Sequence, residues 1–427
     1  MRTPIEEYMA QLLDSCGKDG GAVADYVPEL ANADPDRFAV AFATPDGKVY
    51  SRGDTDVAFS IQSISKPFTY ALAIADRGLD EVLRHIDVEP SGDAFNEISL
   101  DPVSGHPRNP MINAGAIAAH SLVEGAGHEE RTGRILDLYS SLAGRRLDVD
   151  EAVFESELAT ADRNMAIAYM LRTVGTLEGE PQDVVRGYTR QCSAAVTVED
   201  LARMAAVLAS GGRSPDGEQL IEQAVNRQVL SVMATCGMYD AAGDWLTTVG
   251  IPAKSGVAGG LIGVLPGQLG IAVFSPRLDA HGNSTRGVKV FGRLNQDMGL
   301  HLMDAAEGAR SVARRYVEGG VPVQEVAGDL RFVEAERVLR SFEQEPGGTN
   351  VVVVDLDRVH HVNDIARRMV LEGIRRLHED GHPVRIVDPS RVLGEPETGD
   401  GEIVRGEQPR GGFVPESFED VATAVRS

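Results

Sequence analysis

The chain of 427 residues is poor in cysteine, lysine and aromatic side chains, and these shortages exclude several classes of protein. Its three cysteines, Cys16, Cys192 and Cys236, lie far apart and form no CxxC pair. An odd number of isolated cysteines does not predict a disulfide framework, so we expect small buried side chains. Because the first residues carry no export signal either, the expected compartment is the cytoplasm.

Basic residues are outnumbered, with 41 Lys and Arg against 65 Asp and Glu and a formal net charge of −24. Binding to nucleic acid or to an acidic membrane requires clustered cations, so neither partner is expected. Residues 255–276 carry no charge and reach the length of a membrane span, but they contain six glycines and Pro266. This segment predicts instead a hairpin of strands 261–265 and 269–274.

The length and a hydrophobic content of 42% predict a folded protein of two or three domains. Two strands precede a mainly helical region, and strands and a closing helix follow it. This order predicts an α/β (α+β) domain over residues 1–318, with an antiparallel sheet flanked by helices and a helical subdomain. The expected elements are helix 4–16, strands 39–44 and 48–52, helices 61–76, 131–142, 151–173, 198–209 and 222–235, strand 245–250, the hairpin, and helix 293–318.

A second, smaller α/β domain is expected over residues 325–427. Its pattern is a helix at 333–343, a β-branched strand at 350–356, a helix at 364–379 and a strand at 384–387. The four consecutive valines 351–354 are typical of a central strand that is buried on both faces.

Ser63 and Lys66 form a Ser-x-x-Lys motif at the start of a helical pattern. Three residues are nearly one helical turn, so the hydroxyl and the amine share a face. A desolvated lysine there can take the serine proton and make the hydroxyl a nucleophile. Pro67 is tolerated in a first helical turn, which places the helix start near Ser63.

This motif is weak evidence alone, because Ser15 and Lys18 have the same spacing at a Gly-rich helix end. A second motif, Lys254-Ser255-Gly256, precedes the predicted hairpin and belongs to the active-site pattern of serine penicillin-recognising enzymes. The Ser-Asp-Asn motif of those enzymes is absent from the chain. The chain has only five lysines, and two of them lie in these motifs, so we do not interpret both as ordinary surface residues.

Amide, carboxylate and phenol side chains occupy the region between the two motifs. Glu157 and Asn164 lie seven residues apart, which places both on one face of the predicted helix 151–173. A carboxylate can bind an ammonium group and amides can bind a carboxylate, so the set suits a small zwitterion. For any single residue, a helix cap or a satisfied polar contact is the alternative.

Together these segments resemble the bacterial and mitochondrial glutaminase family, whose catalytic domain has the serine β-lactamase-like fold. The resemblance extends from about residue 20 to 310 and rests on seven ordered motifs. They are Tyr26 within 24–30, then 62–67, 109–116, 157–166, 188–193, 236–240 and 254–260.

The resemblance implies hydrolysis of L-glutamine to L-glutamate and ammonia without a metal or an organic cofactor, usually by a homo-oligomer such as a tetramer or dimer. It also implies a role for each matching residue. Ser63 would be the nucleophile, Lys66 its general base and Tyr239 a proton-shuttling hydroxyl. The main-chain N–H groups of Ser63 and Val257 would bind the oxyanion, and Tyr26, Asn113, Glu157, Asn164 and Tyr188 would hold the substrate.

The carboxyl-terminal part resembles STAS domains, with strand 351–356 leading to Asn363 and Asp364 at a helix start. Phosphorylatable members have a serine or threonine where this chain has Asp364, which we expect to cap the helix. The resemblance implies a protein partner. His360 and His361 lack a third metal ligand nearby, so a polar strand end is expected there.

Two other functions stay open at this point. The same scaffold could hydrolyse a β-lactam or a peptide, or a decayed site could sense glutamine and pass the signal to the second domain. The intact Ser63, Lys66 and Tyr239 argue against decay.

Overall fold

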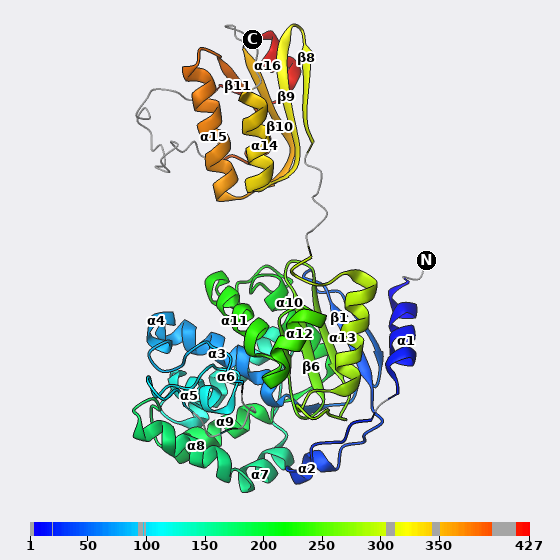
Figure 1. Ribbon diagram of the computed structural model, residues 1–427, viewed down its shortest axis with the longest axis vertical. Coiled ribbons are helices and arrows are strands. Elements are labelled where there is room, and N and C mark those ends of the chain that lie inside the picture. The colour runs from blue at the N-terminus through cyan, green and yellow to red at the C-terminus, as the bar shows by residue number, and fades with distance from the viewer. Residues whose placement is uncertain are drawn as a thin grey trace. The chain divides into compact units, whose positions relative to one another are not determined.

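The computed structural model describes residues 4–18, 20–92, 97, 100–304, 312–343, 351–394 and 416–427. The chain divides into two compact units, Met1–Asp304 and Ala305–Ser427 (Figure 1). Both units combine helices with a sheet, and the first unit ends before residue 318, where the sequence placed the domain boundary.

A five-stranded antiparallel sheet forms the centre of the first unit, in the order β2-β1-β7-β6-β5. The predicted hairpin is present as β6 and β7, and the predicted strands 39–44 and 48–52 pair as β1 and β2. The uncharged segment forms β6, β7 and part of β5. Within the described residues, no helix has the length and apolar character needed to cross a bilayer. The strands are β1 (Ala39–Ala43), β2 (Val49–Gly53), β5 (Ala253–Ser255), β6 (Gly260–Leu265) and β7 (Leu269–Phe274).

Alternating side chains of this sheet bury two separate cores. Val40 and Val273 point to one face, where helices α1 (Ile5–Cys16), α12 (Ala242–Thr248) and α13 (Thr285–Met298) pack. Ala41 and Ala272 point to the other face, which α10 (Val198–Ala209) and the helical subdomain cover (Figure 1). The sheet is therefore buried between helical layers, because successive side chains point to opposite faces and helices cover both faces.

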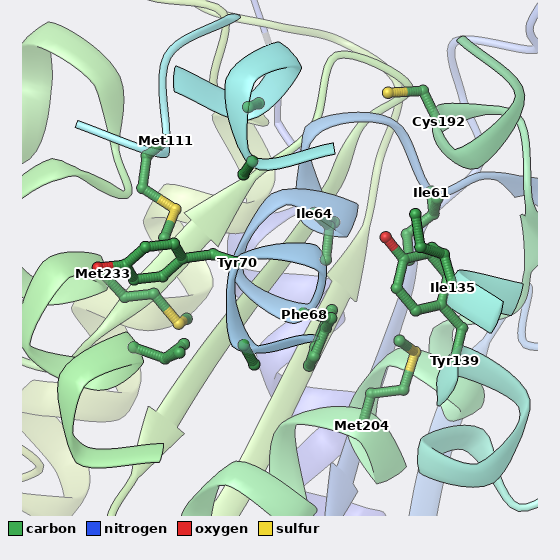
Figure 2. Packing of buried hydrophobic residues seen from close by; sticks show 14 of the residues in the cluster. Ile61, Ile64, Phe68, Tyr70, Met111, Ile135, Tyr139, Cys192, Met204 and Met233 are labelled. Atoms are coloured by element: carbon green, nitrogen blue, oxygen red, sulfur yellow. The ribbon is translucent and has the colours of Figure 1, made fainter. Parts of the chain in front are cut away.

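Helix α3 (Ser65–Arg77) runs through the middle of the helical subdomain and is buried along most of its length. Figure 2 shows Tyr70 on one side of α3 beside Met111 and Met233, while Phe68 faces the Tyr139 side. The Phe68 and Tyr139 rings meet edge to face at 6.0 Å. The other helices are α2 (Pro28–Ala31), α4 (Leu79–Val82), α5 (Asn113–Leu122), α6 (His128–Ala143), α7 (Glu151–Ala159), α8 (Asp162–Thr173), α9 (Pro181–Cys192) and α11 (Gln223–Cys236).

Three predicted elements of this unit are wrong. The single helix 151–173 is two helices, because α7 ends at Ala159 and α8 begins at Asp162. The strand expected at 245–250 is mostly helix α12, held by the Trp245 indole, which donates to the carbonyl of Ile251 and meets the Phe291 ring. The long helix 293–318 is also wrong, because α13 ends at Met298 and Gly299 has a φ of 61°.

The second unit has its own five-stranded sheet, in the order β12-β11-β10-β9-β8. Strand β10 lies at its centre, parallel to β9 and β11, and its valines 352–354 are buried as predicted. Residues 312–318, predicted to be helical, form the edge strand β8. The elements are β8 (Val312–Glu318), β9 (Val321–Leu330), α14 (Phe332–Glu343), β10 (Val352–Val362), α15 (Asp364–Glu379), β11 (Val384–Val387), β12 (Glu416–Phe418) and α16 (Val421–Arg426).

Helices α14 and α15 bury a core against one face of this sheet, and α16 packs on the other. The predicted helices 333–343 and 364–379 and the strand 384–387 are confirmed, whereas Asn350 lies outside the described residues. Asn363, not Asp364, caps α15, because its side chain accepts the N–H of Ala366. Asp364 is the first helical residue, and its side chain is 85% exposed.

Candidate active site

Ser63 lies in a 3₁₀ turn, Gln62–Ile64, that leads directly into α3. A short strand, β3 (Phe59–Ser60), pairs with β4 (Ala195–Val196) and fixes the entry to this turn. Gln62 adopts a φ of 51°, which non-glycine residues rarely do and which the surrounding structure must enforce. Pro67 falls in the first turn of α3, so the helix start predicted near Ser63 is correct to within two residues.

Lys66 lies in the buried first turn of α3, three residues after Ser63, and is 1% exposed. Its Nζ donates to the carbonyl of Met111 at 3.2 Å and to Oδ1 of Asn113 at 2.7 Å. Burial disfavours the charged amine and lowers the pKa of Lys66 to about 7. A large fraction of this side chain is therefore neutral at neutral pH.

The five lysines separate into two groups. Lys18, Lys48 and Lys289 are exposed, whereas Lys66 and Lys254 are fully buried in the first unit. Ser15 and Lys18, the second Ser-x-x-Lys pair, lie exposed at the end of α1. Burial therefore distinguishes the two motifs that spacing alone could not.

Tyr239 follows α11 and also has a positive φ, 58°. Its hydroxyl donates to the carbonyl of Ser255 at 2.8 Å, and its side chain is also hydrogen-bonded to Ser63. Burial raises the pKa of Tyr239 above its ordinary value, so the phenol carries its proton. Ser63 and Tyr239, distant in sequence, are thus in contact, and Lys66 follows Ser63 by three residues at the start of α3.

A cavity of about 250 Å³ opens beside Ser63. The five residues predicted to hold the substrate and the two predicted to bind the oxyanion all line it. Tyr239, which was also predicted to contact the substrate, does not. Lys66 and Tyr239 are not among the lining residues and connect to them through Asn113 and Ser63. The lining residues are Tyr26, Val27, Gln62, Ser63, Asn113, Glu157, Thr160, Ala161, Arg163, Asn164, Tyr188, Cys192 and Val257.

Amide and hydroxyl groups form a chain along one wall of the cavity. Nδ2 of Asn113 donates to Oδ1 of Asn164 at 3.0 Å, and the Tyr188 hydroxyl lies 3.4 Å from Oδ1 of Asn113. Asn113 begins α5, and Gly115 follows because a Cβ there would lie 2.0 Å from the carbonyl oxygen of Asn109. The substrate wall and Lys66 are therefore joined through Asn113.

Glu157 lies at the end of α7, on a different helix from Asn164. The prediction that a single helix face carries both residues is wrong, although the break between α7 and α8 still brings both to the cavity. Burial raises the pKa of Glu157 to about 7, and the hydrogen bond from Nε2 of Gln62, at 3.0 Å, opposes this rise.

The sequence assigned no role to Gln62, Thr160, Arg163 or Cys192, all of which line the cavity. Gln62 and Arg163 each lie next to a predicted site residue in the sequence, and this position is the only feature that could have suggested them. Nothing in the pattern indicates that Gln62 contacts Glu157, which lies 95 positions away.

Across the described ranges, no group of three His, Cys, Asp or Glu side chains is placed to hold a metal ion. The three cysteines are free and buried, as expected. His360 and His361 lie at the end of β10.

Comparisons with known proteins agree on one family. The family model described as Glutaminase matches residues 21–303. A glutaminase of Corynebacterium glutamicum is 50% identical over 410 residues, covering 94% of this chain and 98% of that protein. A glutaminase of Trichormus variabilis is 50% identical over 288 residues, covering 67% of this chain and 86% of that protein.

Solved structures give the same result. The crystal structure of Mglu superposes with a TM-score of 0.84 at 50% identity, covering 92% of this chain and all of that one. A probable glutaminase from Bacillus subtilis, complexed with 6-diazo-5-oxo-L-norleucine, has a TM-score of 0.65 at 33% identity over 71% of this chain and 98% of its own. The chain therefore belongs to the glutaminase family.

Proposed function

We propose that this enzyme, a glutaminase, hydrolyses L-glutamine to L-glutamate and ammonia through an acyl-enzyme formed on Ser63. The observation that carries the proposal is a fully buried lysine, Lys66, one helical turn from Ser63, which lines a cavity with polar walls. No cofactor takes part in the proposed reaction. We assign residues 1–304 to the serine β-lactamase-like fold class. This unit contains all the residues of the proposed mechanism.

Lys66 serves as the general base in this mechanism. Its lowered pKa, which follows from burial, leaves a neutral amine that can accept the Ser63 proton. The carbonyl of Met111 and the amide oxygen of Asn113 orient the amine by accepting its N–H groups. Deprotonated Oγ of Ser63 then attacks the side-chain carbonyl carbon of glutamine.

The attack turns the substrate carbonyl oxygen into an oxyanion. Ser63 and Val257 both line the cavity, and their main-chain N–H groups stabilise this charge. When the tetrahedral intermediate collapses, the C–N bond breaks and the leaving nitrogen takes a proton by way of the Tyr239 hydroxyl. Ammonia departs, and a water molecule then attacks the ester and releases glutamate by the reverse proton route.

Substrate binding follows the chemistry of the cavity walls. Glu157, when ionised, pairs with the α-ammonium group of glutamine. Asn113, Asn164, Tyr26 and Tyr188 offer amide and hydroxyl groups to the α-carboxylate and the side-chain amide. Because glutamine has no net charge, local groups and not the overall charge of −24 give recognition.

Ammonia release from L-glutamine tests this function when the full chain is compared with Ser63→Ala. We expect the substitution to lower kcat by at least about a thousandfold, because the nucleophile is lost. Ser15→Ala is the matched control, since Ser15 has the same Ser-x-x-Lys spacing on the surface, and it should keep full activity. Activity in Ser63→Ala within tenfold of wild type would overturn the assignment of the nucleophile.

For the second unit we propose a STAS-like domain that binds a protein partner, in a cytoplasmic homo-oligomer, either a dimer or a tetramer. Its central parallel strand β10 and the helix start at Asn363 support this assignment. With a carboxylate at Asp364, a kinase has no hydroxyl to modify at that position, so the proposed contact is constitutive.

A further inference from the structure

Lys254, on β5, is the second fully buried lysine, and the mechanism above does not use its side chain. Its Nζ lies 4.0 Å from the centroid of the Tyr239 ring. The same amine donates to the carbonyl oxygen of Ser255 at 2.8 Å. The Tyr239 hydroxyl donates to that oxygen at the same distance, so one carbonyl joins both side chains.

Tyr239 requires such contacts to keep its conformation. A φ of 58° is unfavourable for a bulky residue and persists only where the surroundings enforce it. The Lys254 amine meets the face of the ring, and the shared carbonyl fixes the hydroxyl. These two contacts define both the plane of the ring and the direction of its O–H group.

Burying the amine of Lys254 costs more free energy than burying an apolar side chain that only fills the core. The amine has no exposed surface, and burial lowers its pKa well below the ordinary value, with the nearby charge of Lys66 adding to the effect. An apolar side chain of similar length would avoid this cost of desolvation. An amine buried at this cost, against the ring of Tyr239, points to a role in activity.

We propose that Lys254 is a positioning residue that holds the Tyr239 hydroxyl in place for proton transfer at Ser63. The inference rests on the proposed role of Tyr239. It concerns geometry: Lys254 touches the ring and the Ser255 carbonyl, and acts on the reacting atoms through them.

A double-mutant cycle in the full chain tests this role, with Lys254→Met, Tyr239→Phe and the combined variant. Methionine keeps the length of the side chain and removes the donor. We expect Lys254→Met to lower kcat about tenfold to a hundredfold, as misplaced catalytic groups do, with KM within about threefold of wild type. In the Tyr239→Phe background the same change should lower kcat by less than about threefold, because the hydroxyl it positions is gone.

Thermal unfolding separates positioning from support of the fold. Removal of a buried amine should leave Tm unchanged or higher, whereas a merely structural lysine would give a lower Tm in proportion to the lost activity. Lys48→Met is the matched control, because Lys48 lies over the Tyr50 ring at 5.4 Å on the surface, and it should keep wild-type kcat. The kcat of Lys254→Gln, which keeps a hydrogen-bond donor on a shorter side chain, should lie between those of wild type and Lys254→Met.

Two results would contradict the inference in different ways. If Lys254→Met lowers kcat equally with and without the Tyr239 hydroxyl, or leaves kcat at the wild-type value, Lys254 does not act through Tyr239. If Tyr239→Phe alone keeps wild-type kcat, the proposed role of Tyr239 fails first, and the positioning role of Lys254 falls with it. Should Lys254→Met not fold, Lys254→Gln in the same cycle gives the same comparison.

Discussion

Two residues of the site, the fully buried Lys66 and the partly buried Glu157, have pKa values shifted in opposite directions to about 7, down for Lys66 and up for Glu157. Burial is the main cause for both, because it penalises a protonated amine and an ionised carboxyl alike. The mechanism requires a neutral Lys66 to accept the serine proton and an ionised Glu157 to bind the substrate ammonium. Both groups must therefore be deprotonated in the competent free enzyme.

The pH dependence of kcat/KM follows from this requirement. As pH falls through about 7 both groups take up a proton, so log kcat/KM should fall with a slope approaching two. Glu157→Gln should raise KM at least about tenfold, because the ionic partner of the substrate ammonium is lost, and should leave a slope of about one. The measurement is a set of initial rates in L-glutamine from about pH 5.5 to pH 8.5.

Glu155→Gln serves as the control for this profile, since Glu155 is exposed on the same helix α7 and should keep the slope of two. An acid limb that is unchanged in Glu157→Gln would show that Glu157 does not titrate in the free enzyme. A rate that rises toward acid pH would contradict a neutral Lys66.

At the scale of elements, the sequence predicts what its local patterns determine. The β6-β7 hairpin follows from two apolar runs joined by Pro266-Gly267-Gln268, and the start of α3 follows from Pro67. The break between α7 and α8 escapes prediction because no glycine or proline marks it. Thr160 ends α7 there, and its hydroxyl donates to the carbonyls of Ser156 and Glu157.

The end of α13 shows a different kind of error. Gly299 marks the stop, but apolar residues continue at helical spacing beyond it, and the pattern alone cannot show that 312–318 pairs with β9. The site shows the same limit. The spacing of Ser63 and Lys66 in the sequence is enough to predict them as a pair. The contact of Gln62 with Glu157 depends on tertiary structure and could not be predicted.

At the scale of the whole molecule, each of the two units has hydrophobic cores of its own. The three core clusters of residues 1–304 and the two of the second unit share no member. The Trichormus variabilis glutaminase is matched over 86% of its length by 67% of this chain. Both facts favour a first unit that is sufficient for turnover.

Truncation after Asp304 should therefore give a folded enzyme with kcat/KM for L-glutamine within about threefold of the full chain. The oligomeric state, measured by light scattering, should change if the second unit takes part in assembly. A cooperative thermal transition establishes that the truncated chain is folded. A folded truncation without turnover would show that the second unit contributes to the site.

The central claim, a glutamyl ester on Ser63, is tested most directly by acid quenching during turnover of L-glutamine, followed by mass spectrometry of the digested protein. The account predicts a glutamyl group on the peptide that contains Ser63, present in wild type and absent from Ser63→Ala. Rapid turnover with no acylated peptide in either enzyme, or a glutamyl group on another residue, would contradict the mechanism.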